Sequence, residues 1–163
     1  MGTSLVAVQL REVIDSDLPL FFEHQQDKVA NHVAAFSATN PDDRAAFDAH
    51  WRRIRSDPAI LMRTILADGA VVGYVAHFIQ FGDPAVAYWL DRVVWGRGVA
   101  TQALRLLLQE IPTRPLYGRA AKDNFASIRV MEKCGFVIIG QDSGYAEARG
   151  QEVDEVILRL DAD

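Results

Sequence analysis

The sequence predicts a mixed α/β fold: a mostly antiparallel central sheet flanked by about four helices. Three observations support this prediction. Apolar, β-branched runs separated by turn residues recur between residues 60 and 90, which indicates a meander of three strands. Two amphipathic helical segments follow it, over residues 99–111 and 124–135, with a strand between them. Two final apolar runs, residues 136–140 and 152–160, are expected to close the sheet as a hairpin with a long connection.

Length and composition limit the function classes. A chain of 163 residues suits one domain, which we expect to span residues 1–163. The net charge of −5 disfavours nucleic acid as a partner, because such a surface needs clustered basic residues. The single cysteine excludes an internal disulfide and a cysteine-based zinc site, and we expect no metal site. No long apolar run or leader is visible, so we expect a cytoplasmic protein without a membrane partner.

The N-terminal part of the chain predicts one strand and a short helix. Residues 5–13 alternate between two sets of side chains and are rich in β-branched residues, as in a strand. Residues 15–17, Asp-Ser-Asp, offer N-cap chemistry to a helix over residues 18–26, and Pro19 suits its first turn. Residues 27–40 are small and polar, which indicates a mobile segment or a short helix.

The next part predicts a helix and then the meander. A helix with acids in its first turn begins near residue 42 and ends at Asp57-Pro58. Strands over residues 60–67 and 70–80 are joined by Asp68-Gly69, a strong hairpin signal, and a third strand covers residues 85–90. The helix is expected to bury one stripe of side chains, Phe47, Trp51 and Ile54.

The loop after the third meander strand, Trp95-Gly96-Arg97-Gly98, has the chemistry of an anion site. Two glycines one residue apart let the backbone bend tightly and approach a ligand closely. The amide groups at the start of the following helix attract phosphate. No Asp or Glu lies between Arg92 and Gln109, which is the pattern expected if a ligand supplies the negative charge. The loop alone leaves two interpretations open, a phosphate site and a simple tight turn.

Neither of the common nucleotide motifs fits this loop. A P-loop requires a Lys after its second glycine, and no Lys lies between Lys28 and Lys122. The dinucleotide motif G-x-G-x-x-G has Thr101 in place of its third glycine. It also opens a parallel βαβ unit, whereas this loop follows an antiparallel meander. Both motifs are therefore disfavoured.

A second motif follows the strand predicted over residues 115–121. The first motif reads Trp-Gly-Arg-Gly-Val-Ala-Thr-Gln-Ala-Leu from Trp95, and the second reads Asn-x-x-Ser-x-x-Val-x-Glu-Lys-x-Gly-Phe from Asn124. Together they resemble the GNAT acetyltransferase superfamily, and most closely the branch that includes the ribosomal-protein alanine N-acetyltransferases. The region of paired motifs covers residues 89–136. The resemblance implies a sheet splayed between strands 4 and 5, with acetyl-CoA in the gap.

The resemblance also implies which residues bind acetyl-CoA. The loop amides would hold the pyrophosphate, and the backbone after the third meander strand would pair with the pantetheine arm. Trp95 marks the named branch, and we interpret it as a support for the loop. Arg97 either contacts a phosphate or is solvated. The residues implied in binding are Trp89, Leu90, Asp91, Trp95, Gly96, Arg97, Gly98, Val99, Ala100, Thr101, Asn124 and Ser127.

The catalytic residues are less clear, because the chain departs from the family pattern. Many GNAT enzymes place a Tyr in the second-motif helix as the proton donor to the thiol, and here that position is Met131. We expect Ser127 to replace it, with Asn124 fixing the pantetheine or the helix start. The alternative is that the Ser127 hydroxyl bonds only its own helix. The base remains open, and the candidates are Asp91, Glu147 and His77.

We therefore expect an acetyl-CoA-dependent N-acetyltransferase that acts on a primary amine by direct transfer in a ternary complex. The amine belongs to a protein N-terminus or to a small molecule, and the resemblance places residues 27–40 in the wall of its pocket. The alternative function is a catalytically weak acyl-CoA-binding sensor or regulatory module of the same fold, and only the missing Tyr favours it. The resemblance also allows a homodimer.

Overall fold

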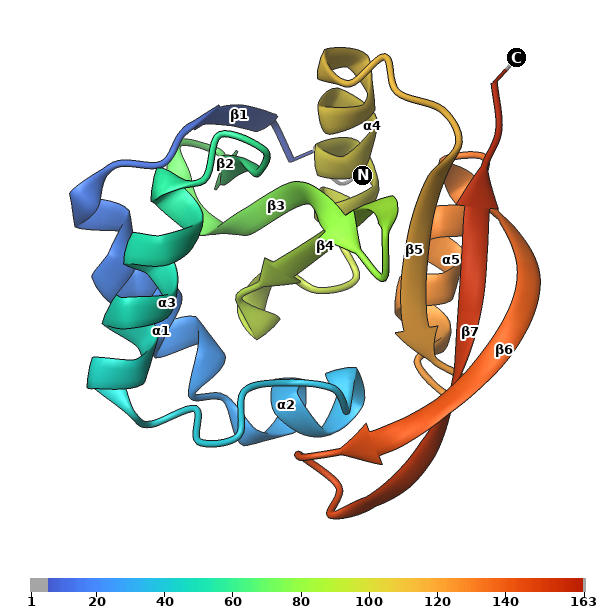
Figure 1. The fold of residues 1–163 in the computed structure, drawn as a ribbon. Helices are drawn as coiled ribbons and strands as arrows, with labels where there is room; N and C mark the ends of the chain where they lie inside the picture. Colours follow the sequence, from blue (N-terminus) through green and yellow to red (C-terminus); the bar gives the residue numbers. More distant parts are fainter. Residues whose placement is uncertain (1–5, 163) are drawn as a thin grey trace, which may run out of the picture.

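The computed structural model describes residues 6–162, and one seven-stranded sheet runs through it in the order β1-β2-β3-β4-β5-β7-β6 (Figure 1). All neighbouring strands are antiparallel except β4 and β5, which are parallel. Leu5, which the predicted first strand included, lies outside the described residues. The strands are β1 (Val8–Glu12), β2 (Leu61–Ala67), β3 (Ala70–Gln80), β4 (Asp83–Leu90), β5 (Leu116–Ala121), β6 (Val137–Ala146) and β7 (Gln151–Leu160).

Helices cover both faces of the sheet, in agreement with the predicted fold class. Within residues 6–162, no helix has the length and apolar character needed to cross a membrane. The α-helices of this part of the chain are α1 (Leu18–Gln25), α2 (Lys28–Ala34), α3 (Arg44–Ser56), α4 (Val99–Glu110) and α5 (Phe125–Lys133), and the short 3₁₀ helices are η1 (Asp15–Asp17) and η2 (Arg92–Val94).

The apolar side chains form two layers, one on each face of the sheet. On one face, Phe21 of α1 and Trp51 of α3 lie 5.0 Å apart between ring centroids, and both pack against Tyr74 of β3. On the other face, α4 and α5 cover a larger cluster that includes Val75 and the fully buried Leu104. Tyr74 and Val75 belong to different layers because successive side chains of a strand point to opposite faces.

The predicted meander, hairpin and helical stripe are confirmed. Ala67 of β2 pairs with Ala70 of β3, so that Asp68-Gly69 forms a two-residue turn. Asp68 and Gly69 have φ values of +50° and +84°, the left-handed conformations that such a turn requires. The α3 stripe faces the sheet as expected, through Phe47, Trp51 and Ile54.

Two stretches are more regular than the sequence indicated. Residues 27–40 contain α2, whose N-cap Asp27 accepts a hydrogen bond of 2.9 Å from the Val29 amide. The expected long connection over residues 141–151 is mostly strand, because β6 continues to Ala146 and pairs with Gln151 of β7. This part of β6 is polar and largely exposed, so it lacks the apolar alternation from which a strand is recognised. Backbone pairing with β7, and not an apolar side-chain pattern, holds this part of β6 in a strand.

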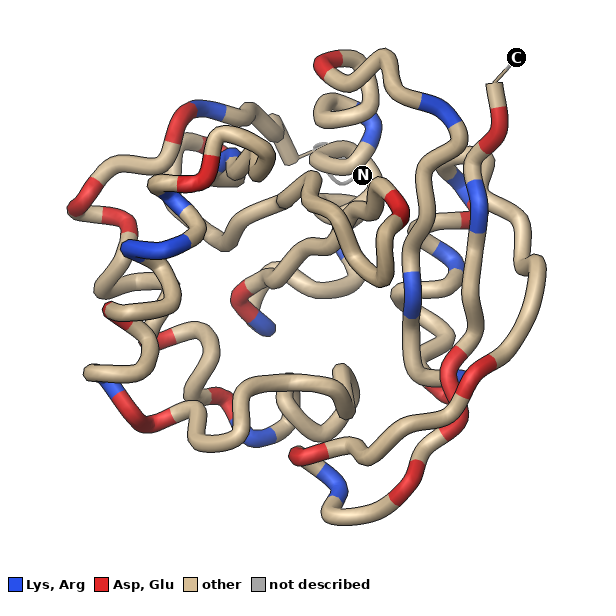
Figure 2. The backbone as a smooth tube through the Cα atoms, in the orientation of Figure 1, with Lys and Arg blue, Asp and Glu red and all other residues tan. Residues whose placement is uncertain are grey.

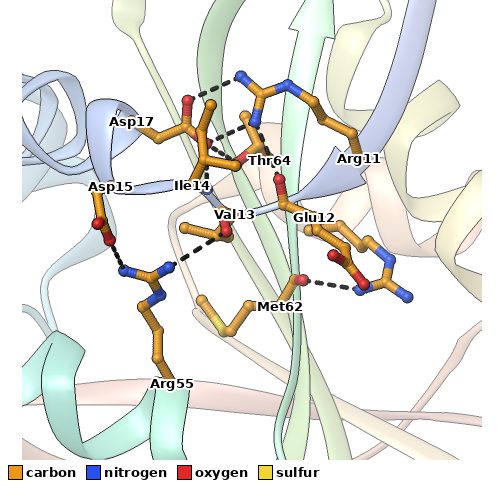
Figure 3. A network of polar contacts seen from close by, with 10 residues as sticks. Arg11, Glu12, Val13, Ile14, Asp15, Asp17, Arg55, Met62 and Thr64 are labelled. Atoms are coloured by element: carbon orange, nitrogen blue, oxygen red, sulfur yellow. Dashed lines mark hydrogen bonds and ion pairs between the residues drawn. The ribbon is translucent and has the colours of Figure 1, made fainter.

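A buried carboxylate fixes the start of α1 to the sheet (Figure 3). Asp17 is 1 % exposed and accepts two hydrogen bonds from the Arg11 guanidinium, at 2.7 and 2.8 Å. It also accepts hydrogen bonds from the Thr64 hydroxyl at 2.6 Å and from the Ile14 amide at 3.0 Å. The expectation that residues 15–17 cap α1 through a side chain is therefore wrong for Asp17. Its oxygens are taken by donors from β1, β2 and the preceding turn.

These donors control the charge state of Asp17. Burial by itself would raise the pKa of this carboxyl, but the hydrogen bonds from Arg11, Thr64 and Ile14 outweigh it and lower the pKa. A depressed folded-state pKa stabilises the folded protein above the unfolded value of about 3.9. That stabilisation is lost as the pH falls through the folded-state pKa.

We expect Asp17→Asn to lower the free energy of unfolding by about 1–3 kcal/mol at neutral pH, because it weakens the charged hydrogen bonds to Arg11 and Thr64, while the partly exposed guanidinium keeps contact with water. Asp15→Asn is the matched control, since Asp15 pairs with Arg55 at 2.7 Å but its side chain is 94 % exposed. Urea unfolding of both variants from pH 7 to pH 3 would measure the effect. The Asp17→Asn deficit should shrink at acid pH, and equal losses in the two variants would contradict the assigned role of Asp17.

Candidate functional site

The sheet is split between β4 and β5. The two strands pair only at Ala85 and Tyr117, near the start of each strand. Because they run parallel and separate beyond this pair, the gap opens towards their C-terminal ends, as predicted. β4 stays with β3 instead, and it approaches β3 so closely at Gly73 that any Cβ there would overlap with the Trp89 carbonyl oxygen.

The open edge of β4 offers backbone groups to the gap. The Asp91 amide donates a 2.7 Å hydrogen bond to the Val72 carbonyl of the β3 side. Because the backbone groups of an antiparallel strand alternate in direction, those of Trp89 also face β3. The groups of Tyr88 and Leu90 then face the gap. Of the predicted stretch Trp89 to Asp91, only Leu90 therefore directs its backbone into the gap, and Tyr88 joins it.

The glycine loop lies directly after this open edge. Gly96 and Gly98 have φ values of +78° and +76°, conformations that a residue with a side chain rarely adopts. A Cβ at Gly96 would meet nothing within 4 Å, and one at Gly98 would meet only Gln102 Nε2 at 4.0 Å. Gly98 is also the N-cap of α4, whose first turn contains no acid and has no side-chain cap. The loop therefore combines free space, uncapped amides and a positive helix end, which together suit a phosphate group.

Trp95 ties the loop to the end of β4, and Thr101 packs within the first turn of α4. The Trp95 side chain is 39 % exposed, and its Nε1 donates a 3.3 Å hydrogen bond to the Leu90 carbonyl at the end of β4. Thr101 is buried, and its carbonyl accepts a 3.7 Å hydrogen bond from Cys134 Sγ. Burial raises the pKa of the Cys134 thiol, so this side chain serves packing. Arg97 is exposed on the loop.

On the α5 side, two hydroxyls lie near one another. Asn124 caps α5 by accepting a 3.2 Å hydrogen bond from the Ser127 amide, which leaves the Ser127 hydroxyl free of the cap. Met131 is buried across Gly118 of β5 and has no proton to donate. Burial raises the pKa of Tyr88, and the nearby Ser127 side chain partly offsets that effect. The sequence interpretation missed Tyr88, although its alternation with Val86 and Leu90 on β4 points it to this face.

On the opposite side, α1 meets the end of β4. Trp89 Nε1 donates a 3.3 Å hydrogen bond to the His24 carbonyl. His24 Nε2 lies 3.5 Å from Asp91 Oδ2, while Asp91 Oδ1 accepts a 3.2 Å hydrogen bond from the Val93 amide. Asp91 thus caps η2 and contacts His24 as well. The sequence interpretation did not consider His24, because nothing in its local pattern distinguishes it from a helix histidine at the surface.

An ion pair beside this contact joins α2 to the same point. In the chain, an acidic residue and then a basic residue follow directly after the last residue of β4 (Figure 2). The basic residue, Arg92, lies 2.7 Å from Asp27 Oδ2 through its Nε. Hydrogen bonds from Arg92 and from the Ala30 and Val29 amides outweigh burial and lower the pKa of Asp27. The end of β4 therefore contacts both helices that precede the long α3.

The other two candidate bases lie elsewhere. His77 pairs with Val86, near the closed end of the split, and its Nδ1 lies 3.1 Å from the Ala85 carbonyl. Four residues of strand separate it from Gly73, or about 13 Å along β3. Glu147 is exposed on the β6–β7 turn. Within the described part of the chain, no three His, Cys, Asp or Glu side chains gather in a way that could hold a metal ion.

The β6–β7 turn closes over α2. Arg149 makes two hydrogen bonds to Asp123, at 2.6 and 2.8 Å, and a third to the His32 carbonyl at 2.9 Å. The Ala148 amide donates to the Ala35 carbonyl at 3.3 Å. The turn is thereby joined to the end of α2 and to the β5–α5 connection. Through these contacts, the β6–β7 turn and the end of α2 lie side by side.

Comparison with known proteins gives a family match and many structural matches. The family model described as an acetyltransferase (GNAT) domain matches residues 8–137. No curated protein sequence matches the chain significantly.

Similar solved structures include RimJ of Mycobacterium smegmatis in complex with CoA-disulfide, with a TM-score of 0.82, 20 % identity, and coverage of 97 % of this chain and 85 % of that one. Spermidine N-acetyltransferase of Vibrio cholerae, in complex with CoA and spermine, has a TM-score of 0.78, 15 % identity and 94 % coverage of both chains. Ribosomal-protein-alanine N-acetyltransferase of Brucella melitensis has a TM-score of 0.74, 19 % identity, and coverage of 94 % of this chain and 99 % of that one.

Proposed function

Because the chain belongs to the GNAT acetyltransferase family, we propose that it transfers an acetyl group from acetyl-CoA to a primary amine, directly and in a ternary complex. The observation that carries this proposal is the position of the glycine loop. Gly96 and Gly98 lie at the N-terminus of α4, immediately after the open edge of β4. A diphosphate at the loop would meet backbone amides. The pantetheine arm along the open edge of β4 would meet unpaired backbone hydrogen-bonding groups.

The residues at the gap suit the parts of CoA. The amides from Gly96 to Ala100 would replace the water shell of the pyrophosphate, with the helix end adding electrostatic attraction. Arg97 is placed to approach a phosphate, and the buried Thr101 supports the first turn. The gap-facing backbone of Tyr88 and the amide of Leu90 would pair with the pantetheine amides as a further strand does. Acetyl-CoA itself supplies an activated acetyl thioester.

The thiol side of the reaction needs a proton donor. We assign this role to Ser127, with the Tyr88 hydroxyl beside it and Asn124 as the residue that fixes the start of α5. A thiolate is a tolerable leaving group, so the donor contributes at the low end of the usual range for a positioned acid. The Ser127 and Tyr88 hydroxyls also weaken the alternative of a sensor without catalytic activity, because only Met131 in place of the usual Tyr favoured that alternative.

The acceptor is proposed to be a protein N-terminus or a small-molecule amine. Support comes from solved neighbours that are named for a ribosomal-protein alanine and for spermidine. Residues of α2 and the β6–β7 turn are the natural walls of an acceptor pocket, because they surround the side of the split sheet opposite α5. We propose a cytoplasmic protein that needs no metal.

Calorimetric titration would test the cosubstrate, with acetyl-CoA and NAD compared on the same protein. We expect binding of acetyl-CoA and none, or much weaker binding, of NAD. A thiol-release screen with an alanine-initiated tetrapeptide, spermidine and kanamycin would then test transfer. Preference for NAD would reject the cosubstrate, and acetyl-CoA binding without turnover on any amine would favour the sensor.

Gly98→Glu should abolish acetyl-CoA binding in a folded protein, because the side chain would fill the loop and its charge would repel the pyrophosphate. The matched control is Gly82→Glu in the β3–β4 turn, which has a φ of +82° and equally open surroundings. Both glycines have a similar positive φ, so a difference in acetyl-CoA binding between the two variants would come from contact with the ligand and not from backbone strain. Retained binding in folded Gly98→Glu would show that the phosphates lie elsewhere.

Ser127→Ala and Tyr88→Phe should each lower kcat by about 10²-fold or less while leaving acetyl-CoA affinity nearly unchanged. If the two hydroxyls act as one unit, the double variant should lose little more than either single variant. The Asn124 cap bonds the Ser127 backbone amide and survives both changes. An unchanged kcat with a lower melting temperature would limit both hydroxyls to a structural role and leave solvent as the proton source.

A further inference from the structure

The sheet face that carries α2 is open beside the split. Ala87 of β4 points to this face, because the next residue, Tyr88, points to the α5 face. Ala87 is exposed although β4 is the central strand of the sheet, so the described helices leave this point uncovered. Counted from the Ala85–Tyr117 pair, Ala87 lies opposite Arg119 of β5 across the opening. An acceptor therefore has room here, on the face opposite the hydroxyl of Tyr88.

A cluster of three charged side chains, Arg119, Glu155 and Asp142, lies on this face of β5, β7 and β6. Arg119 Nη1 donates hydrogen bonds to Glu155 Oε1 at 2.6 Å and to Asp142 Oδ2 at 3.2 Å. One arginine thus serves two carboxylates, and the cluster keeps one excess negative charge. Arg159 lies on the same face, four residues after Glu155 on β7, but it pairs with Asp161 at 2.8 Å and does not compensate this charge.

Glu155 is the member of the cluster best suited to hold a ligand. Its side chain is 15 % exposed, and among the described residues its Oε2 has no hydrogen-bond partner. Oε2 is not itself a buried atom, so it reaches the open space on this face. A largely buried carboxylate with one free oxygen favours a cationic hydrogen-bond donor as its second partner. Asp142 is 55 % exposed, and hydrogen bonds from the Ser143 amide and from Arg119 lower its pKa, so it is charged at neutral pH.

Two exposed phenylalanines flank the cluster. Phe81, in the β3–β4 turn, is 76 % exposed, and the Arg119 guanidinium lies 4.5 Å from the centre of its ring. Phe36, which follows α2, lies over Gly144 of β6, two residues after Asp142 on the same face. The faces of aromatic rings carry negative potential, so they attract cations and accept alkyl chains. Charge and walls therefore favour the same kind of ligand.

The cluster lies at a suitable distance from the split. Glu155 and Asp142 belong to the first and second strands beyond β5, about 5 and 10 Å further from the gap. Glu155 pairs with Ala121, which the strand register places opposite Trp89, one residue beyond Tyr88. A short aliphatic diamine with one nitrogen at the acetyl group can therefore place its other nitrogen at the cluster.

We propose that this cluster binds a second ammonium group of the acceptor, so that the protein prefers aliphatic diamines and polyamines. The inference rests on the amine acetylation proposed above and names its substrate class. The distal ammonium bonds Glu155 Oε2, and Asp142 adds attraction through its charge. Arg119 holds both carboxylates in position, and the alkyl chain of the acceptor passes over Ala87. The distal nitrogen stays protonated, and only the proximal amine is acetylated.

Three acceptors with similar four-carbon chains test the preference: butylamine, putrescine and γ-aminobutyrate. Their distal ends are a methyl group, an ammonium and a carboxylate. We expect kcat/KM to be about tenfold higher for putrescine than for butylamine, and lowest for γ-aminobutyrate, since each distal charge meets an excess negative charge. Equal values for putrescine and butylamine would overturn the proposal. So would a preference for γ-aminobutyrate, which would assign the free edge of Arg119 to a carboxylate.

Variants of the cluster test its residues. Glu155→Gln should raise the KM of putrescine about tenfold and the more exposed Asp142→Asn about threefold, while the KM of butylamine stays unchanged. Asp154→Asn is the matched control, because Asp154 is exposed and points to the opposite face of β7. Asp142→Asn changes an exposed side chain, so it keeps the test valid if Glu155→Gln does not fold.

Calorimetric titration of spermidine onto the CoA-saturated protein measures the same site without turnover. Spermidine should bind more weakly to Glu155→Gln and Asp142→Asn than to the wild type and Asp154→Asn. Equal affinity in all four proteins would show that the cluster does not hold the distal ammonium. A wild-type protein that binds acetyl-CoA, and binds spermidine through Glu155, but acetylates no amine would support the cluster and overturn the proposed function.

Discussion

The site depends on one constraint, which is that β4 remains paired with β3 and leaves β5 after a single pair, Ala85 with Tyr117. A continuous sheet would have satisfied the backbone groups at the edge of β4. The split leaves those of Tyr88 and the amide of Leu90 without a strand partner, immediately before a glycine loop and a helix start. Buried backbone hydrogen-bonding groups require partners, so the unpaired edge suits the extended ligand that we propose for it.

Helix α1 connects this surface to the stability of the protein. Its start is held by the buried Asp17 carboxylate, which bonds Arg11 and Thr64 of the two outermost strands on that side. Its last turn brings His24 to the end of β4. A short helix held at both ends can position a side chain more accurately than a loop can. Two solved neighbours share the fold at 15 % and 19 % identity but are named for different acceptors, which fits a fixed gap with variable walls.

Much of the fold could be read from local sequence. The meander, the Asp68-Gly69 hairpin, the α3 stripe and the glycine loop each follow from short-range chemistry: strand alternation, left-handed turn residues or helical spacing. The resemblance to the GNAT superfamily, confirmed by the family match, added the split between the fourth and fifth strands. The cap at Asn124 was also readable, because a cap is a contact within one turn of helix.

Tertiary structure decided what depends on contacts between distant residues. Asp17 stands where a helix cap was expected, yet donors from β1 and β2 take its oxygens because they meet it in a buried site. The polar half of β6 forms a strand only because β7 pairs with it. The sequence by itself determined the glycine loop, because its left-handed conformations follow from Gly96 and Gly98. The contact between His24 and Asp91, 67 positions apart in the chain, exists only in the packed protein, because it depends on α1 packing against the end of β4.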